Sequence, residues 1–273
     1  MIKKFGIIGK PIKHSLSPVL HNYWFEKYEI NASYSIIDVN EDNLKDVVSK
    51  IKDKTLSGLN ITLPYKQRIV PHLDYLVNDA KITSSVNTLY LDDKNNTVGE
   101  NTDVFGLQAA YLKEVDKASE KKALVIGAGG VSPSVILSLE KSGVKNISII
   151  NRTYEKCVFL KKKFVNIKII KWEKLEEAIK DYDIIINATS LGLKNEEDFS
   201  FNFKNTKENL IFIDTIYNPL ETKTLKFLRD KFTKVFNGLE MFIYQGQKAF
   251  YLWNKINPEI DQKLIELLIS KLK

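Results

Sequence analysis

The chain has 273 residues, 44% of them hydrophobic, and a formal net charge of +7. It can bury a sizeable core and is long enough for two domains. Its single cysteine, Cys157, excludes a disulfide framework and a thiolate metal site, and its three histidines show no paired ligand spacing. No apolar run reaches transmembrane length, and residues 1–9 predict a strand and a turn rather than a signal peptide, so the cytoplasm is the simplest compartment.

The first hundred residues alternate short strands with helices. Apolar alternation and turn residues predict strands near 4–8, 33–39, 57–62, 86–91 and 97–101, and helices near 18–29 and 41–51. Residues 93–97 read Asp-Lys-Asn-Asn-Thr and predict a hairpin turn between the last two strands. Residues 102–113 predict a helix that leads out of this part of the chain.

The next part repeats the alternation of strand and helix. Strands are predicted near 123–127, 147–151, 166–170, 183–187 and 210–214, with helical segments between them. This order is typical of a parallel, doubly wound sheet. Two helical segments come last, at 239–256 and 259–272, and the simplest arrangement returns them to the first domain.

The turn after the strand at 123–127 is rich in glycine. It reads Gly127-Ala128-Gly129-Gly130-Val131, and Ser132 stands where a dinucleotide fingerprint has its third glycine. Glycines in such a turn let backbone N–H groups approach a pyrophosphate at a helix N-terminus. The same turn also serves flavins, methyl donors or plain packing of a helix on a strand.

The end of the following strand favours one of these ligands. An NAD site usually has Asp or Glu there, which accepts a hydrogen bond from the ribose 2′-OH. This chain instead has Asn151 and Arg152, with Lys156 one helical turn further on. Cationic side chains in place of a carboxylate suit a 2′-phosphate, so we predict NADP. The competing interpretation of Arg152 is a solvated surface arginine.

These patterns together predict an α/β chain with two domains. Residues 1–105 form an α/β substrate-binding and catalytic domain. Residues 106–237 form a Rossmann-like NADP domain with a doubly wound parallel sheet. Residues 238–273 form the C-terminal helices that pack on the substrate domain.

Three junctions between a strand or loop and a helix in the first domain carry candidate functional residues. Ser15 and Ser17 precede a helix and could hold a carboxylate there, although Ser17 alone would serve as an N-cap, with Ser15 not needed for the cap. Lys66 follows a strand that ends before a proline, and Asp103 lies near a helix start. A solvated lysine and a capping aspartate are the ordinary interpretations. Together, however, they supply what a ketone reductase needs, a proton donor held by a carboxylate.

The positive charge also raises the question of a nucleic-acid partner. The excess consists of lysines scattered on amphipathic helices, as at 161–163, and not of an arginine–aromatic stripe. The richness of the chain in lysine, asparagine and isoleucine explains the charge equally well. We therefore expect no nucleic-acid partner. We also expect a small-molecule substrate, no membrane partner, and a monomer or homodimer.

These residues belong to a series of motifs through which the chain resembles the shikimate dehydrogenases along essentially its whole length. Any one motif is weak, but all of them in order at the family's spacing are highly specific. In chain order they are Pro11-Ile12-x-His14-Ser15-x-Ser17-Pro18, Gly58-x-Asn60-Ile61-Thr62-x-Pro64-x-Lys66, Val86-Asn87-Thr88, Gly99-x-Asn101-Thr102-Asp103-x-x-Gly106, Gly127-Ala128-Gly129-Gly130, Asn151-Arg152-Thr153, Asn187-Ala188-Thr189-Ser190-x-Gly192, Asp214-x-x-Tyr217-x-Pro219 and Asn237-Gly238-Leu239-x-Met241-x-x-x-Gln245.

The resemblance implies reversible reduction of 3-dehydroshikimate to shikimate with NADPH, in the pathway through chorismate to aromatic amino acids. It implies Lys66 and Asp103 as the catalytic pair, and no metal, because an ammonium polarises the carbonyl. Ser15 and Ser17 are implied to hold the substrate carboxylate. The other implied substrate contacts are Thr62, Lys66, Asn87, Asp103, Tyr217 and Gln245. The implied NADP contacts are Gly127, Ala128, Gly129, Gly130, Val131, Thr215, Gly238 near the nicotinamide, and Asn151, Arg152, Thr153 and Lys156 around the 2′-phosphate.

Two departures and three alternatives accompany this resemblance. Ser84-Ser85 stands where the family usually has Gly-Ala, which bears on the backbone beside Asn87, and the glycine turn continues Val131-Ser132-Pro133 where small residues are commoner. A quinate/shikimate dehydrogenase with looser substrate and cofactor use is the first alternative, and Ser17 and Arg152 argue against it. A catalytically silent NADP sensor is the second, disfavoured by an intact Lys66 and Asp103. A nucleic-acid binder is the third.

Overall fold

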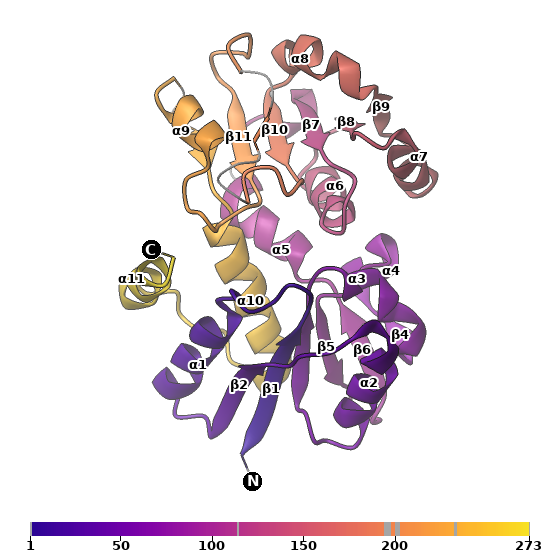
Figure 1. The fold of residues 1–273 in the computed structure, drawn as a ribbon, viewed down its shortest axis with the longest axis vertical. Coiled ribbons are helices and arrows are strands. Elements are labelled where there is room, and N and C mark those ends of the chain that lie inside the picture. Colours follow the sequence, from indigo (N-terminus) through magenta and orange to yellow (C-terminus); the bar gives the residue numbers. More distant parts are fainter. Residues whose placement is uncertain (1, 114, 194–197, 200–202, 232–233, 273) are drawn as a thin grey trace. The chain divides into compact units, whose positions relative to one another are not determined.

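The computed structural model describes residues 2–113, 115–193, 198–199, 203–231 and 234–272 (Figure 1). They divide into two compact units. The first comprises residues 1–105 and 243–271, and the second comprises residues 106–242. The boundary at which the chain returns from the second unit to the first lies inside helix α10 (Leu239–Asn254), between residues 242 and 243. The sequence pattern predicts this boundary between residues 237 and 238.

The first unit contains a mixed six-stranded sheet in the order β2-β1-β3-β5-β6-β4. Strand β1 pairs in parallel with β2 and β3, while β5 pairs antiparallel with β3 and β6. The strands are β1 (Lys3–Ile8), β2 (Ala32–Ile36), β3 (Gly58–Ile61), β4 (Tyr75–Leu76), β5 (Thr88–Leu91) and β6 (Thr97–Glu100). The predicted hairpin is confirmed, and its turn is held by Asp92 Oδ1, which accepts from the backbone N–H groups of Lys94 and Asn96.

Seven helices of the described chain belong wholly or partly to this unit. They are α1 (Ser17–Lys27), α2 (Leu44–Lys52), α3 (Tyr65–Arg68), α4 (Asn78–Thr83), α5 (Asp103–Leu107), α10 and α11 (Gln262–Ser270). The sequence pattern missed β4, α3 and α4, because elements of two to six residues are too short to show a period. The C-terminal helices return to this unit as predicted. The indole of Trp253 in α10 donates to Leu89 O, and that of Trp24 donates to Glu259 O just before α11.

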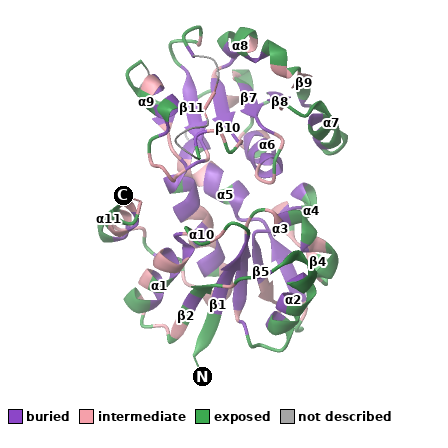
Figure 2. Cartoon of the chain, viewed as in Figure 1, coloured by how far each residue is buried: buried purple, intermediate pink, exposed green. Residues whose placement is uncertain are grey.

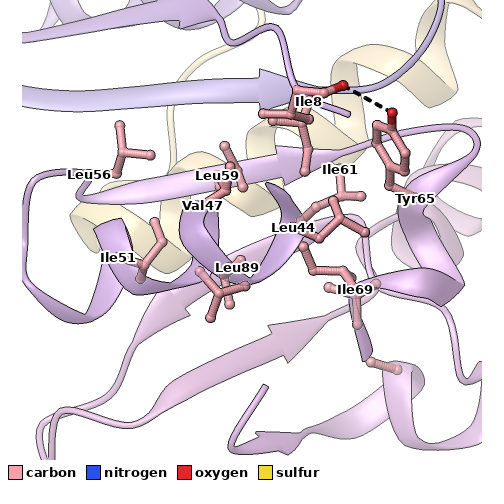
Figure 3. Close-up of a cluster of buried hydrophobic side chains, with 14 residues drawn as sticks. Ile8, Leu44, Val47, Ile51, Leu56, Leu59, Ile61, Tyr65, Ile69 and Leu89 are labelled. Atoms are coloured by element: carbon pink, nitrogen blue, oxygen red, sulfur yellow. Dashed lines mark hydrogen bonds between the residues drawn. The ribbon is translucent and has the colours of Figure 1, made fainter. Parts of the chain in front are cut away.

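Helix α2 shows how the sequence builds the core that carries the site. Leu44, Val47, Val48 and Ile51 recur at helical spacing and are all buried against strands of the sheet. Figure 3 shows this cluster, and it includes Tyr65, whose hydroxyl donates to Val39 O at 3.0 Å. The residue next to Lys66 is therefore fixed in the core, which limits the freedom of the α3 backbone.

The second unit has the predicted parallel sheet, in the order β12-β11-β10-β7-β8-β9 with every pair parallel. Its strands are β7 (Lys122–Ile126), β8 (Asn146–Ile150), β9 (Lys168–Ile170), β10 (Ile184–Asn187), β11 (Ile211–Asp214) and β12 (Lys234–Phe236). Its helices include α6 (Ser132–Lys141), α7 (Tyr154–Lys163), α8 (Leu175–Ala178) and α9 (Lys223–Arg229), and α5 continues as a π-helical turn at Gln108–Leu112. Strand β12, three residues long, was not predicted.

Most residues of the interior strands of both units are buried (Figure 2). Residues 123–126 of β7 and 184–186 of β10 are apolar runs because helices cover both faces of a doubly wound sheet. Short 3₁₀ turns lie at Glu41–Asn43, Val70–His72, Ala118–Glu120, Trp172–Lys174 and Ile179–Asp181. Among the described residues, no helix is long and apolar enough to cross a membrane.

Candidate active site

Lys66 and Asp103 form a buried ion pair in the first unit. The chain leaves β3, passes Pro64 and enters α3, which places Lys66 in the first turn after the strand, as predicted. Asp103 is the first residue of α5, directly after β6. Lys66 Nζ lies 2.5 Å from Asp103 Oδ2, and the two side chains are 11% and 7% exposed. Two sequence-predicted residues 37 positions apart therefore meet as a hydrogen-bonded acid–base pair.

Asn87 contacts the other oxygen of the Asp103 carboxylate. The Thr102 backbone N–H donates to Asn87 Oδ1 at 2.8 Å, and a backbone N–H can only donate. This fixes the orientation of the amide, so Asn87 Nδ2 faces Asp103 Oδ1 and donates to it at 2.8 Å. Asn87 Nδ2 also lies 3.3 Å from Gln245 Oε1 in α10. Asn87 therefore holds the carboxylate besides being available to a substrate.

A second layer of buried polar groups supports Asn87 from the sheet. Asn60 Nδ2 donates to Asn87 O at 3.0 Å and to Thr88 Oγ1 at 3.2 Å. Its Oδ1 accepts from the Tyr34 hydroxyl at 2.7 Å. These groups are in or next to β2, β3 and β5, and all are buried, so each needs the partner it has. The network makes the position of Asp103 depend on three strands.

Asn101 completes the support at the start of α5. Its Oδ1 accepts from the Asp103 backbone N–H at 3.1 Å, and its Nδ2 donates to Ser85 O at 2.9 Å. The ordinary interpretation of Asp103 as a helix cap is therefore wrong, because Asn101 accepts that N–H and the Asp103 carboxylate is turned to Lys66 and Asn87. The sequence motifs contained Asn60, Asn101 and Thr102, but we assigned them no role. The available signal was that each is a polar residue in or next to a strand predicted at 57–62 or 97–101.

The structure corrects the capping role expected of Ser17. Ser17 is the first residue of α1 and not its N-cap. Leu16 is the N-cap, and no side chain caps the helix, so the expectation that Ser15 is not needed for capping is confirmed. Ser15 Oγ accepts the Ser17 backbone N–H at 3.2 Å and tightens the turn that leads into the helix. The chain turns into the helix one residue earlier than expected, which moves Ser17 into the helix and makes its hydroxyl unnecessary for the cap. Ser17 is 4% exposed, and Ser15 is partly exposed.

Thr62 lies between β3 and α3 and is partly buried. Its backbone N–H donates to Ile8 O at 2.9 Å, and its carbonyl accepts from Tyr65 N at 2.9 Å. A Cβ on Gly9 would clash with the Thr62 methyl group, so glycine at position 9 makes room for Thr62. The loop that carries Ser15 and Ser17 and the loop that carries Thr62 therefore start from adjacent points on β1 and β3.

The departure at Ser84-Ser85 leaves the neighbouring backbone bonded. Ser84 ends α4 with φ of 49°, in the left-handed region where glycine has no steric cost, which explains the glycine usual in the family. The Val86 N–H still donates to Lys66 O at 2.8 Å, and the Ser85 carbonyl still accepts from Asn101. The serine therefore adds local strain, and the backbone that presents Asn87 keeps its hydrogen bonds.

The second unit holds the glycine turn between β7 and α6. Gly127 has φ of +111°, and a Cβ there would lie 2.8 Å from Ala188 O, so only glycine fits. Ser132 is fully buried, and its hydroxyl accepts from Gly129 N at 2.9 Å, so this departure from the fingerprint tightens the turn. The open backbone at Gly129 and the start of α6 suit a pyrophosphate.

The predicted 2′-phosphate residues follow β8. Asn151 joins this strand end to the glycine turn, because its Oδ1 accepts from Ala128 N at 3.1 Å while its Nδ2 donates to Thr153 O at 2.9 Å. Arg152, Thr153 and Lys156 are exposed on the surface at the start of α7. The two cations therefore stand where a phosphate can reach them without desolvation of a buried charge.

Thr215, Tyr217 and Gly238 also belong to the second unit. The Thr215 hydroxyl donates to Asn187 O at 2.9 Å, and Tyr217 stacks on Phe242 with ring centroids 4.8 Å apart. A Cβ on Gly238 would clash with Thr215 O, which explains glycine at that position. Tyr217 is thus separate in the fold from the other predicted substrate contacts, all of which lie in the first unit.

The described residues contain no group of three or more His, Cys, Asp or Glu side chains that could hold a metal ion. The Lys66–Asp103 pair of the first unit offers proton transfer by an ammonium held against a carboxylate. The second unit offers a glycine turn with a cationic strand end, a set that fits a 2′-phosphorylated dinucleotide.

Comparisons with known proteins identify the family of both parts of the chain. A model of the shikimate dehydrogenase substrate binding domain matches residues 7–89, and a model described as shikimate / quinate 5-dehydrogenase matches residues 110–226. A shikimate dehydrogenase (NADP(+)) from Pelagibacter ubique (strain HTCC1062) is 47% identical over 268 residues, which cover 98% of this chain and 99% of that protein.

The chain is also similar to solved structures of shikimate dehydrogenases. The crystal structure of shikimate dehydrogenase from Aquifex aeolicus is 36% identical with a TM-score of 0.89, covering 98% of this chain and 97% of that one. The enzyme from Thermus thermophilus, solved in complex with NADP(H) and shikimate, is 29% identical with a TM-score of 0.86 and full coverage of both chains. The chain therefore belongs to the shikimate dehydrogenase family of NADP-dependent oxidoreductases.

Proposed function

We propose that this chain reduces 3-dehydroshikimate to shikimate with NADPH, and that Lys66 and Asp103 are its catalytic pair. The observation that carries this proposal is the buried contact of 2.5 Å between Lys66 Nζ and Asp103 Oδ2 at the ends of two strands. A buried lysine is costly unless it is paired, and here Asp103 supplies the partner.

Lys66 donates the proton in the reductive direction. NADPH, when bound, supplies the hydride that adds to the carbonyl carbon. As negative charge develops on the carbonyl oxygen, the Lys66 ammonium stabilises it and then transfers a proton to it, which leaves a neutral amine. Solvent reprotonates the amine. In the oxidative direction Lys66 must instead accept the hydroxyl proton, so alkaline pH favours oxidation of shikimate.

Asp103 and Asn87 orient the ammonium and the ring. The Asp103 carboxylate accepts from Lys66 on one oxygen and from Asn87 on the other, so it cannot rotate without breaking one hydrogen bond. We assign the substrate carboxylate to the hydroxyls of Ser15 and Ser17, and further ring contacts to Thr62, Gln245 and Tyr217. These groups raise the effective concentration of the ketone at Lys66.

The second unit binds the cofactor in this proposal. The turn from Gly127 to Val131 holds the pyrophosphate, and Arg152 and Lys156 hold the 2′-phosphate, with Thr153 beside them. Asn151 sets the distance between these two parts, because it joins Ala128 to the strand end. Thr215 and Gly238 border the nicotinamide end.

One assay tests the proposal against its alternatives. Purified protein is given shikimate or quinate with NADP or NAD, and the appearance of reduced nicotinamide is followed by absorbance. We expect the highest kcat/KM with shikimate and NADP. Equal values with quinate or NAD would instead indicate the broader quinate/shikimate enzyme. Binding of NADP without turnover of either substrate would indicate a silent sensor.

A further inference from the structure

A buried carboxylate lies at the carboxyl end of β11 in the second unit. Asp214 follows Ile211-Phe212-Ile213, is 0% exposed, and pairs in register with Asn187, the last residue of β10. The two strands are adjacent in Figure 1. Placing a carboxylate in such a site is costly unless its oxygens have partners. The partners of Asp214 therefore indicate what the residue does.

The carboxylate of Asp214 closes the loop that follows it at both ends. Its Oδ1 accepts from the Ile216 backbone N–H at 3.0 Å, and its Oδ2 accepts from the Thr222 hydroxyl at 3.2 Å. Thr222 is also the N-cap of α9, since its hydroxyl accepts from Leu225 N. Residues 215–222, which carry Thr215 and Tyr217, are thus fixed at both ends to one side chain.

Asn187 extends this support to the loop after β10. Its Oδ1 accepts from the Thr189 backbone N–H at 3.0 Å, which fixes the amide so that Nδ2 faces Asp214 Oδ1 and donates to it at 3.0 Å. The same Nδ2 lies 3.1 Å from Leu191 O. A Cβ on Gly192 would lie 2.8 Å from Thr222 Cγ2, so the two loops are packed against each other.

Both loops border the place where a doubly wound sheet binds its ligand. Strand β7 lies between β8 and β10, so the order of connections reverses there, and ligands bind at the carboxyl ends of the strands at such a point. The loop after β10 contacts the glycine turn, because Ala188 O lies against Gly127. Thr215, in the loop after β11, bonds to Asn187 O and lies against Gly238.

We propose that Asp214 is a positioning residue for NADP, and that it acts by holding the loops after β10 and β11 through Asn187, Ile216 and Thr222. This inference rests on the proposed function, because these loops matter to the reaction only if they border the cofactor. Burial raises the pKa of Asp214 to about 7, and hydrogen bonds from Ile216, Thr222 and Asn187 only partly oppose that effect. A charge so disfavoured by its surroundings is consistent with a residue kept for the geometry of its oxygens.

The test compares two substitutions at position 214. Asp214→Ala leaves the Ile216 N–H and the Asn187 amide without their acceptor. Asp214→Asn is nearly isosteric and keeps an acceptor for both groups, and the Thr222 hydroxyl has a second lone pair to accept from the new amide as well as from Leu225 N. Dissociation of NADP is measured by isothermal titration without substrate, and kcat, both KM values and Tm are measured alongside.

We expect Asp214→Ala to raise the Kd for NADP about tenfold or more, as the loss of buried hydrogen bonds predicts, while Asp214→Asn stays within about threefold of the wild type. Asp183→Ala is the matched control. Asp183 also joins two segments, by accepting from Lys122 N and Lys207 Nζ at 2.8 Å each, but it lies at the amino end of β10. Its loss should lower Tm and leave NADP binding unchanged.

A second pair of variants keeps the test decisive if Asp214→Ala does not fold. Thr222→Val removes the hydroxyl that bonds to Asp214, and Thr222→Ser retains it. Thr222→Val should weaken NADP binding, whereas loss of the α9 cap alone would change only Tm. Wild-type Kd for NADP in folded Asp214→Ala, or in Thr222→Val, would show that Asp214 is purely structural. A wild-type protein that binds no NADP would contradict the proposed function itself.

Discussion

The side-chain amide of Asn87 donates to Asp103 Oδ1 at 2.8 Å, on the opposite oxygen from the one that faces Lys66. Asn87 is therefore part of the machinery that orients the proton donor, in addition to any contact with substrate. This relationship separates two roles that kinetics can distinguish, because loss of a substrate contact raises KM while loss of orientation lowers kcat.

Asn87→Ala should lower kcat as well as raise the KM for shikimate. Removing a buried donor to a charged group costs about 1–3 kcal/mol, so we expect kcat/KM to fall roughly 5- to 150-fold. Asn22→Ala is the control, because the Asn22 amide bonds through both its oxygen and its nitrogen, to the Tyr34 backbone, but has no contact with the catalytic pair. An Asn87→Ala enzyme with wild-type kcat would limit Asn87 to substrate binding.

Lys66→Ala should reduce kcat by about 10²–10⁴-fold, the usual contribution of a positioned proton donor. Asp103→Asn should also reduce kcat, since it removes the charge that orients the ammonium. The double variant should lose less than the two effects combined, because the residues act as one unit. The measurement is kcat and KM with both substrates saturating. If Lys66→Ala keeps wild-type kcat and only raises KM, Lys66 binds substrate without transferring the proton.

Arg152→Ala should weaken NADP binding about ten- to hundredfold and leave NAD nearly unchanged, because only NADP carries the phosphate that Arg152 would contact. Lys162→Ala is a matched loss of one positive charge near the other end of α7. It should affect neither cofactor. The Kd values for both cofactors decide the question, and an equal loss for NADP and NAD after Arg152→Ala would rule out a phosphate contact.

Ser17→Ala should raise the KM for shikimate with little change in Tm, because Ser17 does not cap α1. Ser15→Ala should do both, since Ser15 Oγ accepts the Ser17 N–H and loss of such a hydrogen bond costs about 0.5–1.5 kcal/mol of stability. Steady-state kinetics and thermal unfolding of both variants test this difference. A Ser17→Ala enzyme with an unchanged KM would remove Ser17 from the carboxylate site.

His21 should make the protein less stable in acid. Burial lowers the pKa of His21 to about 3 from an ordinary 6.5, and the imidazole is stacked on Tyr34 with ring centroids 4.5 Å apart. Between those values the unfolded chain binds a proton that the folded chain does not, so stability falls as pH falls, by up to about 1.4 kcal/mol per pH unit.

His21→Phe should flatten this slope when unfolding free energies are measured by denaturant titration between pH 4 and 6.5. The difference from the wild type isolates His21 from Asp214, whose raised pKa acts in the opposite direction over a similar range. Replacement of the exposed His72, as His72→Gln, should leave the slope unchanged. Identical slopes for His21→Phe and the wild type would mean that His21 is protonated in the folded protein.

The sequence by itself determined the features that depend on local pattern. Alternation of apolar residues predicted the parallel sheet of the second unit, because buried strands between helices read as short apolar runs. The glycine turn was predictable, since Gly127 needs a positive φ and a close approach to Ala188 that other residues do not permit. Lys66 was placed correctly after Pro64, because a proline ends the strand before it.

Only the tertiary structure decided which polar groups meet. Asn60 and Asn87 are 27 residues apart, and Asn187 and Asp214 are likewise 27 apart, so strand pairing and not local sequence brings them together. The capping of α1 by Leu16 instead of Ser17 depended on a shift of one residue in the helix start, which no propensity resolves. Buried donors and acceptors bond to the partners that the fold brings near them, so these partners depend on the tertiary structure of the whole chain.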